Sequence, residues 1–395
     1  MKAVVIGAGR VGLGCAAVIA HQAGCEVVVL ARGAVCARLA EHGAAVVHTV
    51  QGPRSAAVRV PVRAVDLQAR RREAVQEIAS ADVVFTAVGP RQLPSLARLL
   101  AEGLGAAQRS VDVIALENAE DAGALLRCGV ADVWAELPAL QRHPHVRHGF
   151  SGAVVDRVVA QRLLSDAQSP VSVVTEEECR VIVDRTALVH DWSWMPGVHA
   201  VADFAAYFRA KLHCYSAGHA TAAYLGMLKG YRFVHAAVAD PEIAEAVRGV
   251  MEEGRQGLLH RYGPHVAGTE ADIDRILHRF ANAALRDTTR RVGQDVPRKL
   301  ARHDRLTGPA RGALRAGVSP ENLAFTIAAA LHVHVPVAPR APRQRRRTIA
   351  SLMGVKPSAP LVEMVHRHWT HLVHPAALLS LRVGLPAWED TTVRI

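Results

Sequence analysis

Three glycines near the start of the chain have the spacing of a turn that holds a dinucleotide. Gly7 permits a tight turn, Gly9 lets the backbone approach a pyrophosphate, and Gly12 allows close contact between helix and strand. Free N–H groups at the start of the next helix would bind the anion, so Arg10 and Val11 are also expected at the cofactor. A structural glycine turn in another kind of α/β protein is the competing interpretation.

The residues after the second expected strand bear on which nicotinamide cofactor is bound. An Asp or Glu normally stands there and hydrogen-bonds the adenosine ribose, but Glu26–Leu30 is followed by Ala31 and Arg32. A guanidinium suits a ribose 2′-phosphate, and the missing carboxylate removes a repulsion of that phosphate. We therefore expect NADP(H) in preference to NAD(H). The alternative is a solvated Arg32 beside an NAD adenosine held by backbone groups.

Two later strands are expected to end beside the nicotinamide. Residues 81–88 run into Gly89, and residues 111–116 run into Glu117 and Asn118. Ligands of open α/β sheets bind outside the carboxyl ends of the strands. The cofactor contacts expected there come from Ala87, Val88, Gly89 and Asn118. An ordinary loop position for Asn118 remains the alternative.

A lysine, a serine and a histidine share a helical spacing in the second half of the chain. On a helix expected over residues 201–228, Lys211, Ser216 and His219 fall within an arc of about 140°. Hydride transfer to or from a carbonyl needs an acid/base for the hydroxyl proton and donors for the developing alkoxide. A desolvated lysine can exchange that proton, whereas arginine cannot. A solvated lysine and a core histidine are the alternatives.

These residues require two kinds of domain to position them. A buried strand over residues 2–6 runs directly into the glycine turn, and residues 11–23 have the small, apolar character of a helix packed on a sheet. From His199 onward helical periodicity dominates. We predict an α/β protein with a Rossmann-type doubly wound sheet in residues 1–195. Residues 196–395 are expected to form a mainly α-helical substrate-binding and catalytic domain.

Composition excludes several other classes of protein. The chain has 395 residues, half of them apolar, which is enough for two domains. Its six cysteines lack paired or zinc-type spacing, which favours a reducing, cytoplasmic setting. We find no signal-peptide pattern and no apolar run of roughly 20 residues, so no membrane association is expected. The net charge of +11 is spread along a chain with 4% aromatic residues, which does not favour nucleic-acid binding.

Two features near the C-terminus suggest further sites, and we assign neither. The Pro- and Arg-rich stretch 336–347 is expected to be an exposed loop between helices. Four histidines have helical spacings but no carboxylate or thiolate partners in a recognised pattern, so no metal is expected. They are His366, His368, His371 and His374.

The chain resembles the polyol-specific long-chain dehydrogenase/reductase family nearly end to end. In that family the lysine that opens the segment matching residues 211–226 is the general acid/base. The resemblance therefore implies this role for Lys211, with His219 orienting the substrate and Asn118 polarising its oxygen. The shared stretches include TAVGP at 86–90, EN at 117–118, VDRV at 155–158, KLHCYSAGHATAAYLG at 211–226 and RKL at 298–300.

Three departures from the family pattern concern the substrate and the cofactor. Ser216 stands where the family has a second asparagine, and its hydroxyl is a shorter hydrogen-bond donor. Gln294 replaces an arginine, and Arg32 lies where an NAD-type acidic residue is usual. The other substrate contacts that the resemblance implies are Asp156, Arg157, Arg298 and Lys299.

Together the residues and the resemblance predict an NAD(P)-dependent dehydrogenase or reductase. Hydride would pass between the nicotinamide and a secondary alcohol or ketone of a polyol or sugar phosphate. One alternative keeps this chemistry but uses a specialised biosynthetic substrate, such as a sugar- or nucleoside-derived phosphate. Another is a protein that senses NADP(H) without turnover. Both a monomer and a dimer remain open.

Overall fold

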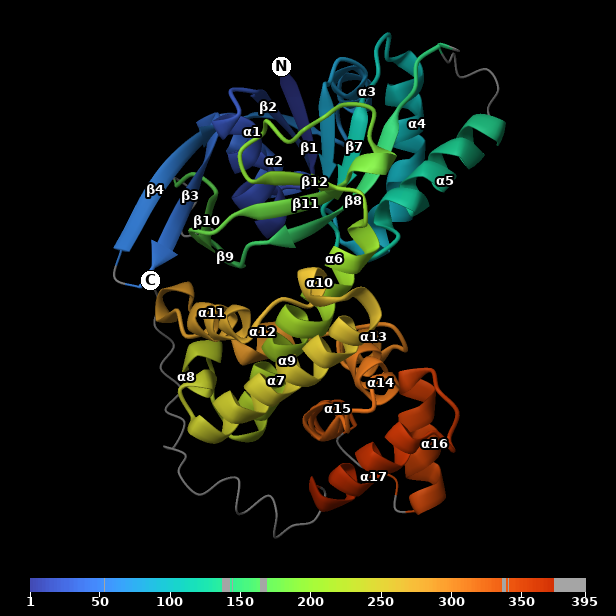
Figure 1. Cartoon of the computed structure of the whole chain (residues 1–395). Coiled ribbons are helices and arrows are strands. Elements are labelled where there is room, and N and C mark those ends of the chain that lie inside the picture. The colour runs from blue at the N-terminus through green and yellow to red at the C-terminus, as the bar shows by residue number, and fades with distance from the viewer. Residues whose placement is uncertain are drawn as a thin grey trace. The chain divides into compact units, whose positions relative to one another are not determined.

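The chain forms two compact units, Met1–Phe208 and Arg209–Ile395 (Figure 1). The computed structural model describes residues 1–52, 54–136, 143, 145–163, 169–335, 339 and 341–372. The division falls after Phe208, whereas the expected boundary lies after residue 195. Strand β12 (Val198–Val201) and most of helix α6 (Phe204–Ala210) lie between these two positions. Strand β12 lies in the sheet of the first unit, where it pairs with β11 (Arg180–Asp184).

The first unit is built on a mostly parallel sheet of eight strands. Their order is β12-β11-β8-β7-β6-β1-β2-β5, and only the pairing of β11 with β8 is antiparallel among the pairs described. This arrangement confirms the predicted Rossmann-type fold. The bounds are β1 (Lys2–Ile6), β2 (Glu26–Ala31), β5 (Arg63–Asp66), β6 (Val83–Thr86), β7 (Asp112–Ala115) and β8 (Gly149–Asp156).

Both faces of this sheet are covered, which explains why its strands are continuous apolar runs. Ala3 and Val5 of β1 face a core that includes a π-helical turn (Gly12–Ala16) and helices α1 (Ala17–Gln22) and α2 (Gly33–His42). Alternate residues of the same strand face a second core. That core is formed with α3 (Arg71–Ala79), α4 (Ala97–Ala106) and α5 (Ala122–Glu136).

A second sheet of four strands, which the sequence analysis did not predict, packs on the first helix of the unit. Its order is β4-β3-β10-β9. A Cβ atom on Gly14 would lie 2.8 Å from Cγ1 of Val159, so the π-helical turn and β9 are in close contact. The bounds are β3 (Ala44–Gln51), β4 (Arg54–Pro61), β9 (Val159–Leu163) and β10 (Ser172–Glu176).

The second unit is mainly helical, as predicted, around a core of small and branched apolar side chains. In the part of the chain that the structure describes, no helix has both the length and the apolar character needed to cross a membrane. The longer helices are α7 (Ser216–Leu228), α9 (Pro241–Tyr262), α11 (Glu270–Phe280), α14 (Thr307–Arg315), α15 (Glu321–His334), α16 (Pro342–Met353) and α17 (Pro360–Leu372). The shorter ones are α8 (Val234–Val238), α10 (Pro264–Ala267), α12 (Thr289–Gly293) and α13 (Val296–Leu300).

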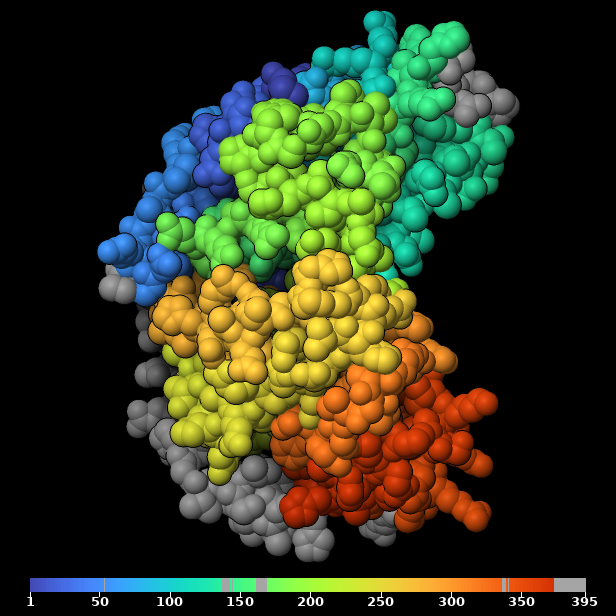
Figure 2. Space-filling model, viewed as in Figure 1, coloured from blue at the N-terminus to red at the C-terminus, as the bar shows by residue number. Residues whose placement is uncertain are grey.

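The expectation of a loop over residues 336–347 is wrong for its second half. Pro342 occupies the first turn of α16, where its missing N–H costs nothing, and the arginines that follow are good helix formers. Arg346 pairs with Glu363 of α17 at 2.7 Å, so these two helices lie together at the surface (red in Figure 2). Residues 336–338 and 340 lie outside the described part of the chain.

Candidate active site

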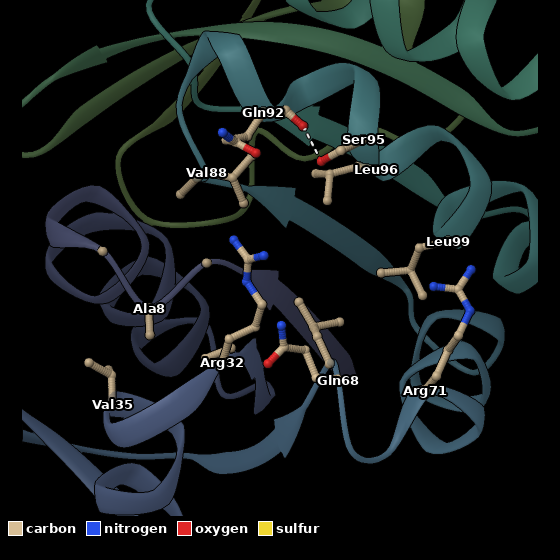
Figure 3. Close-up of a pocket in the computed structure, with 15 residues that line it drawn as sticks. Ala8, Arg32, Val35, Gln68, Arg71, Val88, Gln92, Ser95, Leu96 and Leu99 are labelled. Atoms are coloured by element: carbon tan, nitrogen blue, oxygen red, sulfur yellow. Dashed lines mark hydrogen bonds between the residues drawn. The ribbon is translucent and has the colours of Figure 1, made fainter.

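A cavity of about 490 Å³ lies in the first unit at the carboxyl ends of β1 and β2 (Figure 3). Five residues expected at the cofactor line it, namely Gly7, Gly9, Arg32, Ala87 and Val88. The other expected cofactor contacts, Arg10, Val11, Gly12, Gly89 and Asn118, are not part of its lining. The rest of the lining is Ala8, Ala31, Val35, Leu67, Gln68, Arg71, Gln92, Ser95, Leu96 and Leu99.

Two glycines of this turn pack so closely against neighbouring backbone that no Cβ atom fits. Gly7 has φ of 113°, and a Cβ atom there would lie 2.6 Å from the carbonyl oxygen of Ala87. A Cβ atom on Gly12 would overlap the carbonyl oxygen of Gly7. The helix expected over residues 11–23 begins with the π-helical turn Gly12–Ala16, a local widening that is frequent at functional sites.

Two arginines line the cavity. Arg32 follows the strand and Arg71 begins α3, and Figure 3 shows the Arg32 side chain near Gln68. Arg71 also pairs with Glu102 at 2.9 Å. Sequence reasoning missed Gln68 and Arg71, because no local motif indicates that the turn after β5 and the start of α3 reach this cavity.

The carboxylate of Asp66, which pairs in register with Ala31 at the end of β2, accepts hydrogen bonds from the backbone. Asp66 ends β5, and its Oδ1 accepts hydrogen bonds from the N–H groups of Gln68 at 2.8 Å and Ala69 at 3.0 Å. These bonds hold the pKa of Asp66 below its ordinary value. None of the described residues that line the cavity is acidic.

Glu117 connects the ends of two neighbouring strands, a role that the sequence analysis did not assign. Its carboxylate is buried and accepts hydrogen bonds from Oγ1 of Thr86 at 2.7 Å and from the N–H of Val88 at 2.8 Å. Glu117 therefore fixes the turn that lines the cavity. Asn118, the next residue, is half-buried. The adjacency of Glu117 to Asn118 is the only sequence signal for this role.

In the second unit, Lys211 lies at a change of helical geometry. The helix expected over roughly residues 201–228 is present without a break from Phe204 to Leu228, but a π-helical turn (Lys211–Tyr215) interrupts its regular geometry between α6 and α7. The arc calculated at 100° per residue does not apply across this wider turn. Lys211 is half-buried and Ser216 is buried.

His219 is held from two sides within the second unit. Its ring stacks on Phe280, with centroids 4.9 Å apart, and its Nε2 lies 3.2 Å from Oδ2 of Asp287. Arg291 binds the same carboxylate through Nε and Nη2. Burial lowers the pKa of His219, while Asp287 opposes this shift only in part. The histidine is therefore neutral near pH 7.

Two basic residues expected at the substrate are bound by other groups of the same unit. Arg298 pairs with Asp295 at 2.7 Å and with Asp304 at 3.2 Å. The buried Lys299 donates to the carbonyl oxygens of Val292 and Gln294. Burial, followed by the charges of Arg305 and Arg298, lowers the pKa of Lys299 to about 7. Of the two, Arg298 is the more exposed, with 36% of its side-chain surface accessible.

Asp156 ends strand β8 of the first unit and Arg157 follows it, and neither is part of the cavity lining. Asp156 is half-buried. The Arg157 side chain is buried, and its Nε donates to the carbonyl oxygen of Glu176 at 3.2 Å. The structure thus directs Arg157 toward the turn between β10 and β11.

Two family models match this chain along most of its length. The mannitol dehydrogenase Rossmann domain matches residues 1–194, and the mannitol dehydrogenase C-terminal domain matches residues 203–343. The chain belongs to the mannitol dehydrogenase family. This confirms the resemblance that the sequence motifs indicated, and it makes the protein an oxidoreductase that acts on CH–OH groups.

Relatives in the mannitol dehydrogenase family cover nearly all of the chain. The mannitol-1-phosphate 5-dehydrogenase of Pseudarthrobacter chlorophenolicus is 36% identical over 348 residues, which is 85% of this chain and 86% of the relative. The enzyme of the same name from Shouchella clausii is 34% identical over 378 residues, or 92% and 99% of the two chains.

Solved structures of mannitol dehydrogenase type share the fold. The Pseudomonas fluorescens mannitol 2-dehydrogenase, solved as a ternary complex with NAD and D-mannitol, matches with a TM-score of 0.77 at 16% identity. That match covers 96% of this chain and 93% of the other. A substrate-free D-sorbitol dehydrogenase matches with a TM-score of 0.75 at 16% identity, covering 96% and 95%.

The cavity lies beside a glycine-rich turn of the kind that binds dinucleotides. The lack of room for Cβ atoms at Gly7 and Gly12 keeps the turn tight and the helix close to the strand, and Gly9 is the position at which the backbone can approach a pyrophosphate. Among the described residues, no group of three or more His, Cys, Asp and Glu side chains is placed to hold a metal ion. His374, the last of the four C-terminal histidines, lies outside those residues.

Proposed function

We propose that this protein is an NADP(H)-dependent dehydrogenase or reductase of a polyol or sugar phosphate. The observation that carries the proposal is the segment from Lys211 to His219, in which an amine begins a π-helical turn and a hydroxyl and an oriented neutral imidazole follow it. Relatives at 34–36% identity are named mannitol-1-phosphate 5-dehydrogenase, which supports a hexitol phosphate as the substrate.

The acid/base role belongs to Lys211 in this proposal. When bound, the nicotinamide supplies the hydride acceptor or donor. Lys211 takes the hydroxyl proton of the alcohol during oxidation and returns it to the alkoxide during reduction. The amide of Asn118 and the hydroxyl of Ser216 donate hydrogen bonds to the same oxygen, which stabilises its developing negative charge.

His219 orients the substrate rather than exchanging its proton. The hydrogen bond to Asp287 uses Nε2 as the donor, so the neutral ring presents Nδ1 as an acceptor for a substrate hydroxyl. Arg298 is the basic residue proposed to bind the far end of the substrate, because it is accessible. Lys299 is buried and donates to backbone carbonyl oxygens, so we propose that it stabilises the segment that carries Arg298. Asp156 and Arg157 stay candidate substrate contacts.

The lining of the cavity favours NADP(H) over NAD(H). A ribose 2′-phosphate carries negative charge, and Arg32 and Arg71 supply positive charge beside it. Because no acidic residue is found in the described lining, no carboxylate there repels that phosphate or accepts a bond from a free 2′-hydroxyl.

A substrate screen followed at 340 nm tests the proposal. Mannitol 1-phosphate, other hexitol phosphates and free polyols are each offered with NAD⁺ and with NADP⁺, and the matching keto-sugar phosphates with the reduced cofactors. We expect turnover of a hexitol phosphate with NADP⁺ preferred. Turnover confined to nucleoside-derived sugar phosphates would support the specialised substrate instead. NADPH binding without oxidation of any alcohol would support a sensing protein.

A further inference from the structure

Two cysteine side chains are in contact just after the glycine-rich turn. Cys15 lies in the π-helical turn Gly12–Ala16, and Cys179 lies in the turn between β10 and β11. Their sulfur atoms are 3.8 Å apart. Because a disulfide bond is about 2.0 Å long, the two sulfurs need to approach by roughly 1.8 Å to form one.

The two thiols differ in exposure and in acidity. Cys15 is completely buried, whereas Cys179 is partly exposed. The hydrogen bond from the Cys15 thiol, together with the charge of the Arg157 guanidinium, lowers the pKa of Cys179 to about 7 against the opposing effects of burial and Glu176. That same hydrogen bond and burial raise the pKa of Cys15. Cys179 is therefore the thiol that is ionised and reached from solvent.

This combination is typical of a redox-sensing pair, in which an accessible thiolate of low pKa has a second cysteine beside it. We propose that Cys179 is a site of oxidation by hydroperoxides, that Cys15 then closes a reversible disulfide with it, and that this bond weakens dinucleotide binding. A disulfide of this kind in a reducing compartment is transient and regulatory rather than structural.

The chemistry balances with a hydroperoxide as the two-electron oxidant. The Cys179 thiolate attacks one peroxide oxygen, the O–O bond breaks, and the other oxygen leaves as hydroxide or alkoxide and takes a proton. The resulting sulfenic acid is attacked by the sulfur of Cys15. This step forms the S–S bond and releases the sulfenic oxygen as hydroxide, which takes the Cys15 proton to become water. A dithiol then reduces the disulfide to the two thiols and is itself oxidised to a disulfide.

The effect on the dinucleotide follows from the packing around Cys15, and it rests on the proposed function. Cys15 is three residues beyond Gly12, which packs against the Gly7 carbonyl with no room for a Cβ atom. Gly14 of the same turn also packs closely, since a Cβ atom there would lie 2.8 Å from Cγ1 of Val159. A shift of this turn toward Cys179 is therefore transmitted to the glycines of the cavity rather than absorbed locally.

Peroxide treatment of the full chain tests the disulfide. After treatment and blocking of free thiols, non-reducing peptide mapping should show one cross-linked pair of peptides, carrying Cys15 and Cys179, with the loss of two hydrogen atoms. The exposed Cys128 provides the matched control, since Cys128→Ser should leave the cross-link intact and Cys179→Ser should abolish it. Sulfenic or sulfinic acid at Cys179 without any cross-link would overturn the proposal.

Titration with NADPH before and after oxidation tests the consequence. We expect affinity to fall by about fivefold or more, the lower end of typical couplings between sites, and to return with dithiothreitol. Cys179→Ser should bind NADPH like the reduced protein with or without peroxide. We replace Cys179 rather than the buried Cys15, because a substitution at the buried position could disturb folding. An unchanged affinity in the mapped disulfide form would overturn the coupling. Failure of the reduced protein to bind any dinucleotide would instead contradict the proposed function and leave the peptide map valid.

Discussion

Asp287 holds His219 through a hydrogen bond of 3.2 Å between Oδ2 and Nε2. Burial by itself would raise the pKa of Asp287, but the hydrogen bonds from His219 and Arg291 outweigh it and keep the pKa well below its ordinary value. The carboxylate is therefore charged throughout the physiological range, and it fixes which nitrogen of His219 carries the proton.

Replacing that carboxylate should separate positioning from proton transfer. In Asp287→Asn the amide no longer fixes the proton on Nε2, so we expect kcat/KM to fall about 10- to 100-fold, mainly through KM. The pH dependence of kcat should keep its shape because Lys211 is intact. Arg291 also loses a charged partner, so unfolding in urea should show a loss of about 3 kcal/mol. A changed pH profile of kcat would contradict the positioning role.

Lys211→Ala should remove most of kcat while NADPH binding survives. Positioned acid/base groups contribute about 10²- to 10⁴-fold, and we expect a loss in that range. Lys211→Arg is the informative companion, because it keeps the charge but cannot release a proton near neutral pH. Steady-state kinetics and an NADPH titration measure both effects. Full activity in Lys211→Arg would show that the residue acts only through its charge.

The N-terminal unit was the more predictable of the two from sequence. The strand, glycine turn and helix follow each other within about two dozen residues, so local pattern is enough to place Gly7 and Gly9 at the cavity. Arg71 reaches the same cavity only through the packing of α3, which no local pattern encodes. Glu117 is similar, because its partners Thr86, at the end of β6, and Val88, just after it, are about 30 residues away in sequence and meet it only in the folded sheet.

The helical unit shows a different limit of sequence reasoning. The spacing of Lys211, Ser216 and His219 correctly indicated a helix, but a regular period cannot reveal a π-helical turn. Asp287, the partner of His219, lies 68 residues farther along the chain. The π-helical turn, which begins at Lys211, and the Asp287 carboxylate, which binds His219, therefore could not be predicted from a local pattern.

Arg32→Ala should shift cofactor preference toward NAD⁺. Losing a charge-assisted contact to the 2′-phosphate costs about 1.5–3 kcal/mol, so the kcat/KM ratio for NADP⁺ over NAD⁺ should fall about 10- to 100-fold. Arg71→Ala should shift the ratio in the same direction. Arg98→Ala is the control, since Arg98 also pairs with Glu102 but does not line the cavity. An unaltered ratio in both Arg32→Ala and Arg71→Ala would rule out these residues as the source of cofactor selectivity.

Glu117→Gln should weaken dinucleotide binding although Glu117 does not line the cavity. The amide keeps one acceptor oxygen but sets an NH₂ group against either Thr86 or the N–H of Val88, which leaves one buried donor unpaired. We expect a loss of about 1–3 kcal/mol in the free energy of unfolding and a higher Kd for NADPH. Thr86→Val, which removes only the hydroxyl bond, should have the smaller effect on Kd. Equal effects of the two variants would contradict a role for the bond to Val88.

His213 makes stability depend on pH in a window set by its environment. Burial, followed by the charges of Arg209 and Arg261, lowers its pKa to about 3, whereas the unfolded chain has a value of about 6.5. Between these values the unfolded state binds the extra proton, so stability is full above pH 6.5 and falls as the pH decreases, by up to about 1.4 kcal/mol per unit. Urea unfolding of His213→Gln between pH 7.5 and 5 should show a shallower loss than the parent protein. His260→Gln, at an exposed position, should keep the parent slope, and identical slopes in all three proteins would show that His213 is not the titrating group.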